Sequence, residues 1–334
     1  MCSKQNWVPI KIMINFLNVR IDTKSFASKN LMPLLLSKQK TKKQTMKKNL
    51  IFLFVLAIAF SSCQKDESTA PSNNGSTQKV ISSSIRFTKK VLVEEFSGCS
   101  YGNVPTSNLM LNNIANSYVD RVYIASLHTG DAMQTQQAST LTNYYSNGSP
   151  VNIPCAMINR GTSTGQRLFN YQQYQANVQQ SLSQSSNCGL AINSRLVNGY
   201  VNVTVQTKFA TALTGNYKVT AYLVNETVSA TGSGYAQVNN FNNLVNNHFY
   251  NMGNPIQSYT HQNVVRKVLS PSFGSMVNSA ALVTGGIDTK QFTCDITTGN
   301  NTSNMCVIAF VTNSGTGEVL NVQRAAVGTT KMGD

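Results

Sequence analysis

Hydrophobic and polar residues alternate along several short segments in the second half of the chain, which is the pattern of half-buried β-strands. In residues 200–209, Val201, Val203 and Val205 alternate with polar residues. The pattern predicts strands, separated by turn sequences, over residues 191–197, 200–209, 217–224, 264–269, 291–296, 305–312 and 318–327. No convincing helical pattern lies among them, so residues 188–330 are predicted to form an all-β sandwich of the jelly-roll or immunoglobulin-like kind. The Asn- and Tyr-rich insertion 232–258 is long enough to be a candidate binding loop.

The preceding part of the chain, residues 85–187, alternates between strand-like and helix-like patterns. Apolar runs predict buried strands over 89–98, 120–128 and 151–160. Helices are expected from Pro105 onward, over 135–145 and around 171–182, where apolar residues recur at helical spacing. Strands that alternate with helices predict an α/β layer architecture with a partly parallel sheet.

Residues 46–62 have the pattern of a bacterial signal peptide: Lys47 and Lys48, an apolar run from Leu50 to Phe60, and then small residues. Eleven apolar residues extend over about 16 Å as a helix, roughly half the hydrocarbon thickness of a bilayer, so the run is too short to span. The cysteine that follows, Cys63, resembles the lipobox cysteine of bacterial lipoproteins, which is acylated after cleavage. We therefore expect a lipid anchor on Cys63.

Residues 63–84 are expected to form a tether behind this anchor. The tether begins with Gln64, Lys65, Asp66 and Glu67, which resemble the signal that sends some Gram-negative lipoproteins to the cell surface. The alternative is an ordinary solvated charge cluster in a linker. Residues 1–45 precede a complete signal peptide without clear periodicity, and we interpret them as an incorrectly assigned upstream extension, with translation starting at Met46.

The net charge of +15 does not indicate nucleic-acid binding. Residues 1–45 carry nine Lys or Arg and one acid, Lys47 and Lys48 follow, and the rest of the chain carries +5 without a basic run. A nucleic-acid binder concentrates its basic residues on one surface. That class of function is therefore set aside.

Three segments together resemble a thioredoxin-like domain and, more narrowly, the outer membrane protein twenty-eight family of Gram-negative lipoproteins. They are Val91–Gly98, the helix entry at Pro105, and Ile153–Arg160. The resemblance continues through the β-rich part, at Tyr259-x-His261 and in residues 307–311 and 318–320, and covers roughly residues 85–330. It implies that Pro154 is the cis-proline that faces the active-site loop.

Members of that family often carry Cys-x-x-Cys where this chain has Tyr101-Gly-Asn-Val104. A dithiol site needs one activated thiolate and a second, resolving thiol. Tyr101 and Val104 supply neither, so a conventional oxidoreductase is not expected. The resemblance also leaves a lone histidine, His261, with Asn263 where the usual second histidine would be, so no metal site and no cofactor are expected.

Two cysteine pairs remain open at this point. Cys99 and Cys155 could approach each other across the vestigial redox loop as a disulfide or a nonstandard redox pair, or they could be unrelated thiols packed as small apolar side chains. Cys294 and Cys306 flank a turn almost symmetrically, so they could bridge a hairpin or stay as buried thiols on adjacent strands.

The sequence contains none of the common hydrolase, phosphate-loop or dinucleotide motifs. Glu94 and Glu95 are neighbours on a strand and point to opposite faces, so they cannot form one acid/base couple; one of them is expected to be half-solvated. We expect a non-catalytic binding and interaction module, a lipoprotein of the outer membrane that is displayed on the cell surface or, alternatively, faces the periplasm. Its expected partner is an extracellular protein, a glycan or an outer-membrane complex. The alternative function is an envelope thiol–disulfide oxidoreductase that uses Cys99 and Cys155.

Overall fold

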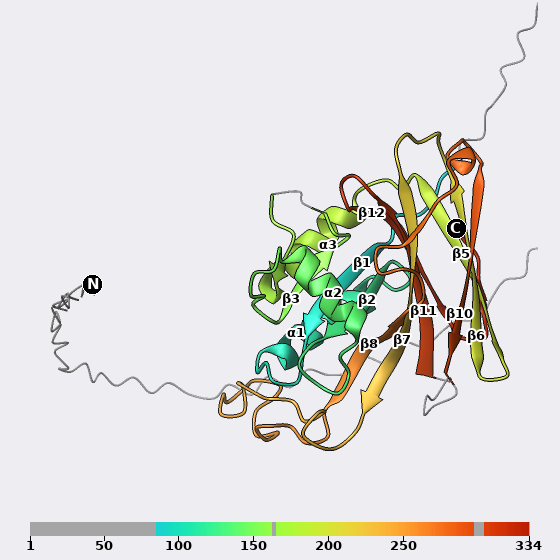
Figure 1. Cartoon of the computed structure of the whole chain (residues 1–334). Helices are drawn as coiled ribbons and strands as arrows, with labels where there is room; N and C mark the ends of the chain where they lie inside the picture. Colours follow the sequence, from blue (N-terminus) through green and yellow to red (C-terminus); the bar gives the residue numbers. More distant parts are fainter. Residues whose placement is uncertain (1–84, 162–164, 297–303, 334) are drawn as a thin grey trace, which may run out of the picture. The chain divides into compact units, whose positions relative to one another are not determined.

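The computed structural model describes residues 85–161, 165–296 and 304–333 (Figure 1). The signal peptide 46–62, Cys63 and the tether to residue 84 lie outside these residues. No helix in the described part of the chain is long and apolar enough to cross a membrane. The helices are α1 (Val104–Ser117), α2 (Gln136–Tyr145), α3 (Tyr174–Leu182) and the short 3-10 turns η1 (Tyr171–Gln173) and η2 (Ser279–Ala281). The strands are β1 (Val91–Ser97), β2 (Val122–His128), β3 (Cys155–Ile158), β4 (Phe169–Asn170), β5 (Cys188–Val197), β6 (Tyr200–Phe209), β7 (Tyr217–Ser229), β8 (Thr260–Val268), β9 (Ser275–Met276), β10 (Ile287–Asp295), β11 (Met305–Asn313), β12 (Val319–Ala326) and β13 (Thr330–Lys331).

Two sheets organise these strands. A nine-stranded mixed sheet has the order β12-β11-β7-β8-β2-β1-β3-β4, with β9 paired to β7, and an antiparallel sheet has the order β10-β6-β5-β13. In the large sheet, β2 runs parallel to both β1 and β8. The pair Ser126–Val264 therefore joins the expected α/β part to the expected β-sandwich part. The boundary predicted near residue 187 does not separate two sheets, because strands from both sides of it share this one.

Alternation along β7 and β11 explains how one sheet serves two cores. Leu223 and Val307 face the small sheet and pack with residues of β5 and β6. Their neighbours Tyr222 and Ile308 point to the other face and join a second core that includes residues of β1, β3 and α2. The two-sheet packing expected of a sandwich is thus present, but one of its sheets continues into the α/β part.

In Figure 1, α1, α2 and α3 lie on the side of the molecule where β1 and β3 are drawn, away from the small sheet. α1 and α3 cover one face, where Leu111 and Val178 pack against Val91 and Val93 of β1. α2 belongs to the opposite core, and its N-terminus is capped by the Thr135 hydroxyl, which accepts a hydrogen bond from the Ala138 amide. The helices predicted over 135–145 and 171–182 are therefore confirmed.

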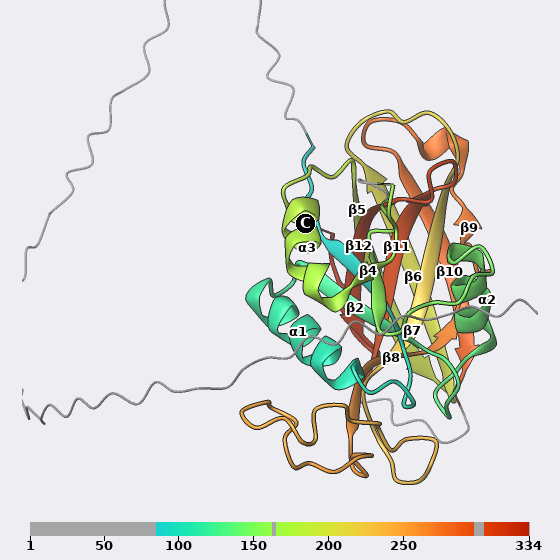
Figure 2. The same ribbon diagram turned by 90° about the vertical axis from the view of Figure 1, so that its left-hand side faces the viewer.

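The predicted insertion is a long loop between β7 and β8. It extends below α1 and the end of β8 in Figure 2. The loop contains almost no regular structure, but side-chain amides hold it together: Asn239 donates to the carbonyl oxygens of Phe249 and Gly253 at 2.9 and 3.0 Å. It is therefore an ordered element, and its first half contacts the loop that follows β1.

Candidate functional site

The loop that joins β1 to α1 occupies the place where the family resemblance leads one to expect a dithiol. Val104 and Pro105 form the buried first turn of α1, and Tyr101 lies half-buried before it. The peptide bond between Ile153 and Pro154 is cis, as the resemblance implies. The side chains of Tyr101 and Val104, however, cannot take part in thiol–disulfide exchange.

Residues 237–240 of the long loop close over this position. The backbone amides of Val238 and Asn240 donate to the carbonyl oxygens of Cys99 and Gly102 at 2.8 and 3.1 Å. The amide of Gln237, which is fully buried, donates to the carbonyl oxygens of Cys99 and Tyr101 at 3.1 and 3.0 Å. A polypeptide substrate could pair with this loop only after displacing the chain's own residues.

The Cys99 thiol is buried in surroundings that keep it protonated. Its sulfur donates to the carbonyl oxygen of Gly234 at 3.3 Å, and the Asp131 carboxylate accepts a hydrogen bond from the Cys99 amide at 3.0 Å. Burial and this neighbouring carboxylate raise the pKa of Cys99 far above its ordinary value. A thiolate nucleophile does not form readily here.

His261 lies beside this thiol and His128 lies beside His261, an arrangement that the sequence did not indicate. His261 Nε2 is 3.7 Å from the Cys99 sulfur and 2.8 Å from the carbonyl oxygen of Tyr235, and burial lowers the pKa of His261 to about 4. His128 Nδ1 lies 2.7 Å from the Asp131 carboxylate. Because His261 is neutral and Cys99 protonated, the pair lacks the thiolate–imidazolium character of a catalytic Cys–His couple.

The second thiol of the suggested redox pair, Cys155, is also free. It lies opposite Phe96 where β3 pairs with β1, and it packs with the core that includes α2, whereas Cys99 packs with Met133 and Val264. Burial, together with the Glu95 carboxyl, raises the pKa of Cys155 to about 12. The structure therefore has the second alternative, two unrelated buried thiols, and contains no Cys99–Cys155 disulfide.

The possible bridge between Cys294 and Cys306 is absent as well. Cys294 lies on β10, which pairs with β6 in the small sheet, whereas Cys306 lies on β11 in the large sheet. Cys294 faces the core between the sheets, and Cys306 faces the opposite core. The hairpin that would have brought the two sulfurs together does not form, and both thiols are free.

Glu94 and Glu95 do point to opposite faces of β1, but the expectation that one is half-solvated is wrong. Both are fully buried. Glu95 accepts hydrogen bonds from the hydroxyls of Ser107 and Ser126 at 2.6 and 3.0 Å. Burial raises its pKa to about 7, against the lowering effect of these two hydrogen bonds. A buried polar group without solvation requires such partners, which explains the serines at both positions.

Glu94 forms a buried ion pair with Arg160. The guanidinium donates to the two carboxylate oxygens at 2.6 and 2.7 Å, and Tyr222 Oη donates to the same carboxylate at 2.7 Å. Burial acts to lower the pKa of Arg160, but the Glu94 carboxylate outweighs it, and the pKa lies well above its ordinary value. Arg160 therefore keeps its positive charge, and it lines a cavity.

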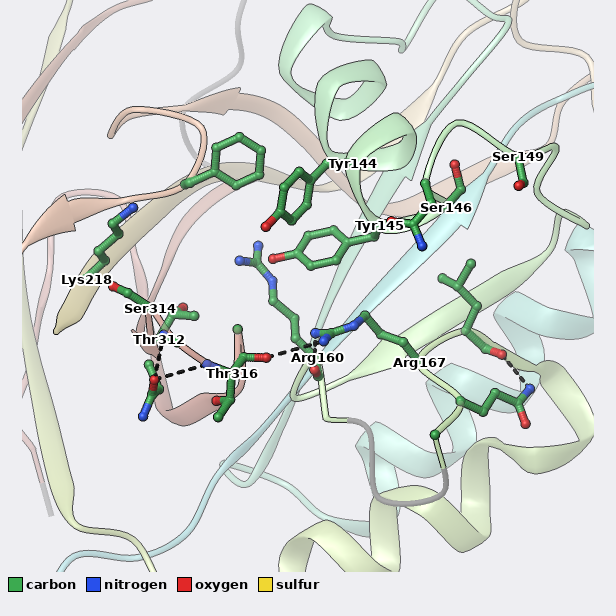
Figure 3. A pocket seen from close by; sticks show the side chains of 18 of the residues that line it. Tyr144, Tyr145, Ser146, Ser149, Arg160, Arg167, Lys218, Thr312, Ser314 and Thr316 are labelled. Atoms are coloured by element: carbon green, nitrogen blue, oxygen red, sulfur yellow. Dashed lines mark hydrogen bonds between the residues drawn. The ribbon is translucent and has the colours of Figure 1, made fainter. Parts of the chain in front are cut away.

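This cavity has a volume of about 850 Å³ and opens beside α2 (Figure 3). Five segments that are distant in sequence meet around it: the end of α2, the loop between β3 and β4, the start of β7, Phe273, and the turn between β11 and β12. Its lining consists of residues 144–147, 149, 150, 160, 165–168, 218, 273 and 312–317. The volume lies within the range of about 300–1,000 Å³ that is usual for small-molecule sites.

The charged side chains of the lining are all cationic: Arg160, Arg167 and Lys218. Arg160 forms an ion pair with Glu94, whereas no ion pair among the described residues involves Arg167 or Lys218. Arg167 is positioned by the carbonyl oxygens of Arg160 and Thr316, to which it donates. The pocket therefore presents two uncompensated positive charges.

Aromatic rings form one wall of the same pocket. The Tyr144 ring centroid lies 5.0 Å from that of Tyr145 and 4.6 Å from that of Phe273. The guanidinium carbons of Arg160 and Arg167 lie 5.0 and 5.3 Å from the Tyr145 ring centroid. Tyr144 remains 60% exposed, so its ring is available to a ligand.

Sequence reasoning did not find this pocket. Arg160 entered only as the last residue of a matched segment, and residues 313–317 only as a turn. The one local signal was the pair Tyr144-Tyr145 at the end of a polar helix. Adjacent residues on a helix point in different directions, so the two rings cannot both pack into a core on one side of this helix. Within the described residues, no group of three or more His, Cys, Asp or Glu side chains is arranged to hold a metal ion.

Comparison with known proteins gave one family and several solved structures. The family model described as Outer membrane protein Omp28 matches residues 138–331. HBP35 of Porphyromonas gingivalis is similar in structure, with a TM-score of 0.56 and 15% identity over 72% of this chain and 76% of that one. A domain of the outer membrane lipoprotein Omp28 from the same organism matches with a TM-score of 0.27 and 14% identity, over 43% of this chain and 89% of that domain. No curated protein matches the sequence. The likeness to HBP35 concerns the fold alone.

Proposed function

We propose that this chain, which belongs to the outer membrane protein Omp28 family, is a lipid-anchored binding protein of the outer membrane that holds its ligand in the pocket beside α2. The observation that carries the binding role is the pocket itself, in which five segments converge on uncompensated cations and an exposed aromatic ring. Family membership supports the outer membrane location. The signal-peptide pattern before Cys63 supports the lipid anchor, and residues 64–67 support display on the cell surface.

The proposal that the protein is not an enzyme is supported by its vestigial redox loop. Tyr101 and Val104 occupy the positions of the usual thiols, residues 237–240 pair with the loop, and Cys99 is held protonated. The order β2-β1-β3-β4, with helices on both faces and cis-Pro154 before β3, supports a thioredoxin-like arrangement that serves as a scaffold rather than as a catalyst.

Protease treatment of intact cells followed by mass spectrometry tests the location. Surface display predicts that peptides from β5 to β12 are released from intact cells. A variant with Lys65, Asp66 and Glu67 replaced by Ala should stay membrane-bound but become protected, and Cys63→Ala should leave the membrane fraction. Full protection of the wild type would place the domain on the periplasmic side.

Glycan and peptide arrays probed with the detergent-purified full chain test the binding role. Ser314→Trp introduces a large ring at an exposed lining position of the pocket, and Thr211→Trp makes the same change at an exposed position outside the lining. We expect Ser314→Trp to abolish array binding and Thr211→Trp to retain it. Equal binding by the two variants would show that the pocket is not the ligand site.

The alternative, a thiol–disulfide oxidoreductase that uses Cys99 and Cys155, has less support because both thiols are buried and their pKa values are raised. An insulin-reduction assay separates the two functions. The binding protein should show no turnover above background, and Cys99→Ser should change nothing. Turnover that Cys99→Ser abolishes would favour the enzyme.

A further inference from the structure

The chemical character of the pocket beside α2 restricts its ligand, provided that the pocket is the binding site proposed above. Arg167 and Lys218 are the cations that a ligand can neutralise, because Arg160 is already paired with Glu94. Among the described residues, no Asp or Glu lies in the lining. A ligand that brings one or two negative charges gains favourable electrostatic interactions, while a cation is repelled.

The guanidinium of Arg167 suits a planar anion such as a carboxylate. Arg167 is held by bonds to the carbonyl oxygens of Arg160 and Thr316, so its guanidinium loses little freedom when it binds. A guanidinium presents parallel donors that match the two oxygens of a carboxylate. Lys218, which lies opposite Thr312 in the β7–β11 pair, adds a second positive charge from another wall.

The end of α2 adds no further positive charge to the pocket. The pocket meets the C-terminal end of α2, at Tyr145 and Ser146, where the helix dipole is negative. This end disfavours a highly charged anion such as a polyphosphate.

The remaining lining is rich in hydroxyl and amide groups and has one apolar face. Ser149, Gln166, Asn313 and Thr316 are among the polar residues, each able to donate to or accept from a ligand hydroxyl. Tyr144 supplies the apolar face, with its exposed ring supported from behind by Phe273. An exposed ring of this kind covers the C–H face of a sugar ring and buries apolar surface from both partners.

From these features we infer that the ligand is an acidic saccharide, in which Arg167 binds the carboxylate of a uronic or sialic acid residue, Lys218 adds a second positive charge from another part of the lining, and Tyr144 stacks on a sugar ring. The inference rests on the proposed function, since it names the ligand class of the same site. A neutral saccharide would leave both cations unpaired, and an aromatic carboxylate would leave the hydroxyl and amide groups of the lining without partners.

Calorimetry and saturation-transfer NMR on the detergent-purified full chain test this inference with matched ligands. The acidic probes are trigalacturonic acid and 3′-sialyllactose, and their neutral counterparts are methyl-esterified trigalacturonate and lactose. We expect at least one acidic probe to bind at least about tenfold more tightly than its neutral counterpart, the effect of one charge-assisted hydrogen bond. The two acidic probes distinguish the uronic from the sialic source of the carboxylate.

Matched variants test whether the charges of the pocket are responsible. Lys218→Gln and Arg167→Gln should each weaken binding of the acidic probe roughly tenfold and leave binding of the neutral probe unchanged. Lys208→Gln removes the same charge from an exposed position on β6 and should have no effect. Tyr144→Ala should weaken both probes at least about threefold, whereas Tyr200→Ala, at another exposed tyrosine, should not.

Three results would overturn the inference. The first is equal affinity for acidic and neutral probes, with both weakened by Ser314→Trp; this result leaves the pocket as a binding site and removes only the acidic class. The second is an equal loss in Lys218→Gln and Lys208→Gln, which would show nonspecific attraction to a basic protein. The third is no binding of any probe while Ser314→Trp still abolishes array binding, which would assign the pocket to another ligand class.

Discussion

The Glu94–Arg160 pair, in which Arg160 also lines the pocket, allows a quantitative test of how a buried ion pair affects the stability of the fold. The guanidinium makes two bonds of 2.6 and 2.7 Å to the carboxylate and one of 2.9 Å to Tyr222 Oη, and both charged side chains are 1% exposed. The Arg160 guanidinium also lies 4.8 Å from the Phe310 ring centroid. Glu94→Gln leaves this network almost unchanged in shape but removes the negative charge.

The expected cost follows from the burial of the remaining charge. Removing one partner of a buried ion pair costs about 3–5 kcal/mol, because the other charge is left uncompensated. Glu94→Gln and Arg160→Met should therefore each lower the free energy of unfolding by about 3–5 kcal/mol. The double variant carries neither charge, so we expect it to recover to within about 2 kcal/mol of the wild type, far from the sum of the single changes.

Urea denaturation followed by circular dichroism measures these differences, on a chain that carries Cys63→Ser so that the lipid anchor is absent. The free energy of unfolding of a single domain is about 5–15 kcal/mol, so a single variant that fails to fold would still be informative if the double variant folds. Costs below about 1 kcal/mol for each single variant, or additive costs in the double variant, would refute this account of the pair.

Further predictions concern the same region. Glu95 keeps its proton up to about pH 7 in the folded chain but loses it near its ordinary pKa of 4.5 in the unfolded chain. Its contribution to the free energy of unfolding is therefore full below pH 4.5 and is lost as the pH rises to 7. The free energy of unfolding of Glu95→Gln should therefore be higher than that of the wild type by up to about 3 kcal/mol at pH 8 and equal to it at pH 4. Urea midpoints of the two proteins that change in parallel with pH would contradict this prediction. A Cβ atom at Gly98 would lie 2.5 Å from the carbonyl oxygen of Thr129, which is too close. Gly98→Ala should therefore lower the thermal midpoint and reduce the free energy of unfolding by about 1–3 kcal/mol. An unchanged midpoint would show that the loop shifts to make room for the methyl group. The buried Cys99 thiol should react with Ellman's reagent only after denaturation, and native reaction within minutes that Cys99→Ser removes would contradict its burial.

Local periodicity determined most of the secondary structure. The alternation over 200–209 predicts β6 with its observed bounds, because side chains on a strand point to alternate faces and only one face of this strand is buried. The proline-led entry at Pro105 likewise predicts α1, since proline suits a first helical turn. The family resemblance was also available from short segments, two of which form the paired strands β1 and β3 beside cis-Pro154.

Tertiary structure alone decided which strands pair and which side chains meet. β8 follows a long loop and still enters the sheet beside β2, so the expected second domain shares its sheet with the first. Cys294 and Cys306 are close in sequence but lie on different sheets, and the alternation that defines a strand does not state which sheet it joins. Arg160 and Lys218 line one pocket because five distant segments converge there. Such contacts depend on packing between elements, whereas a sequence pattern reports only on each element by itself.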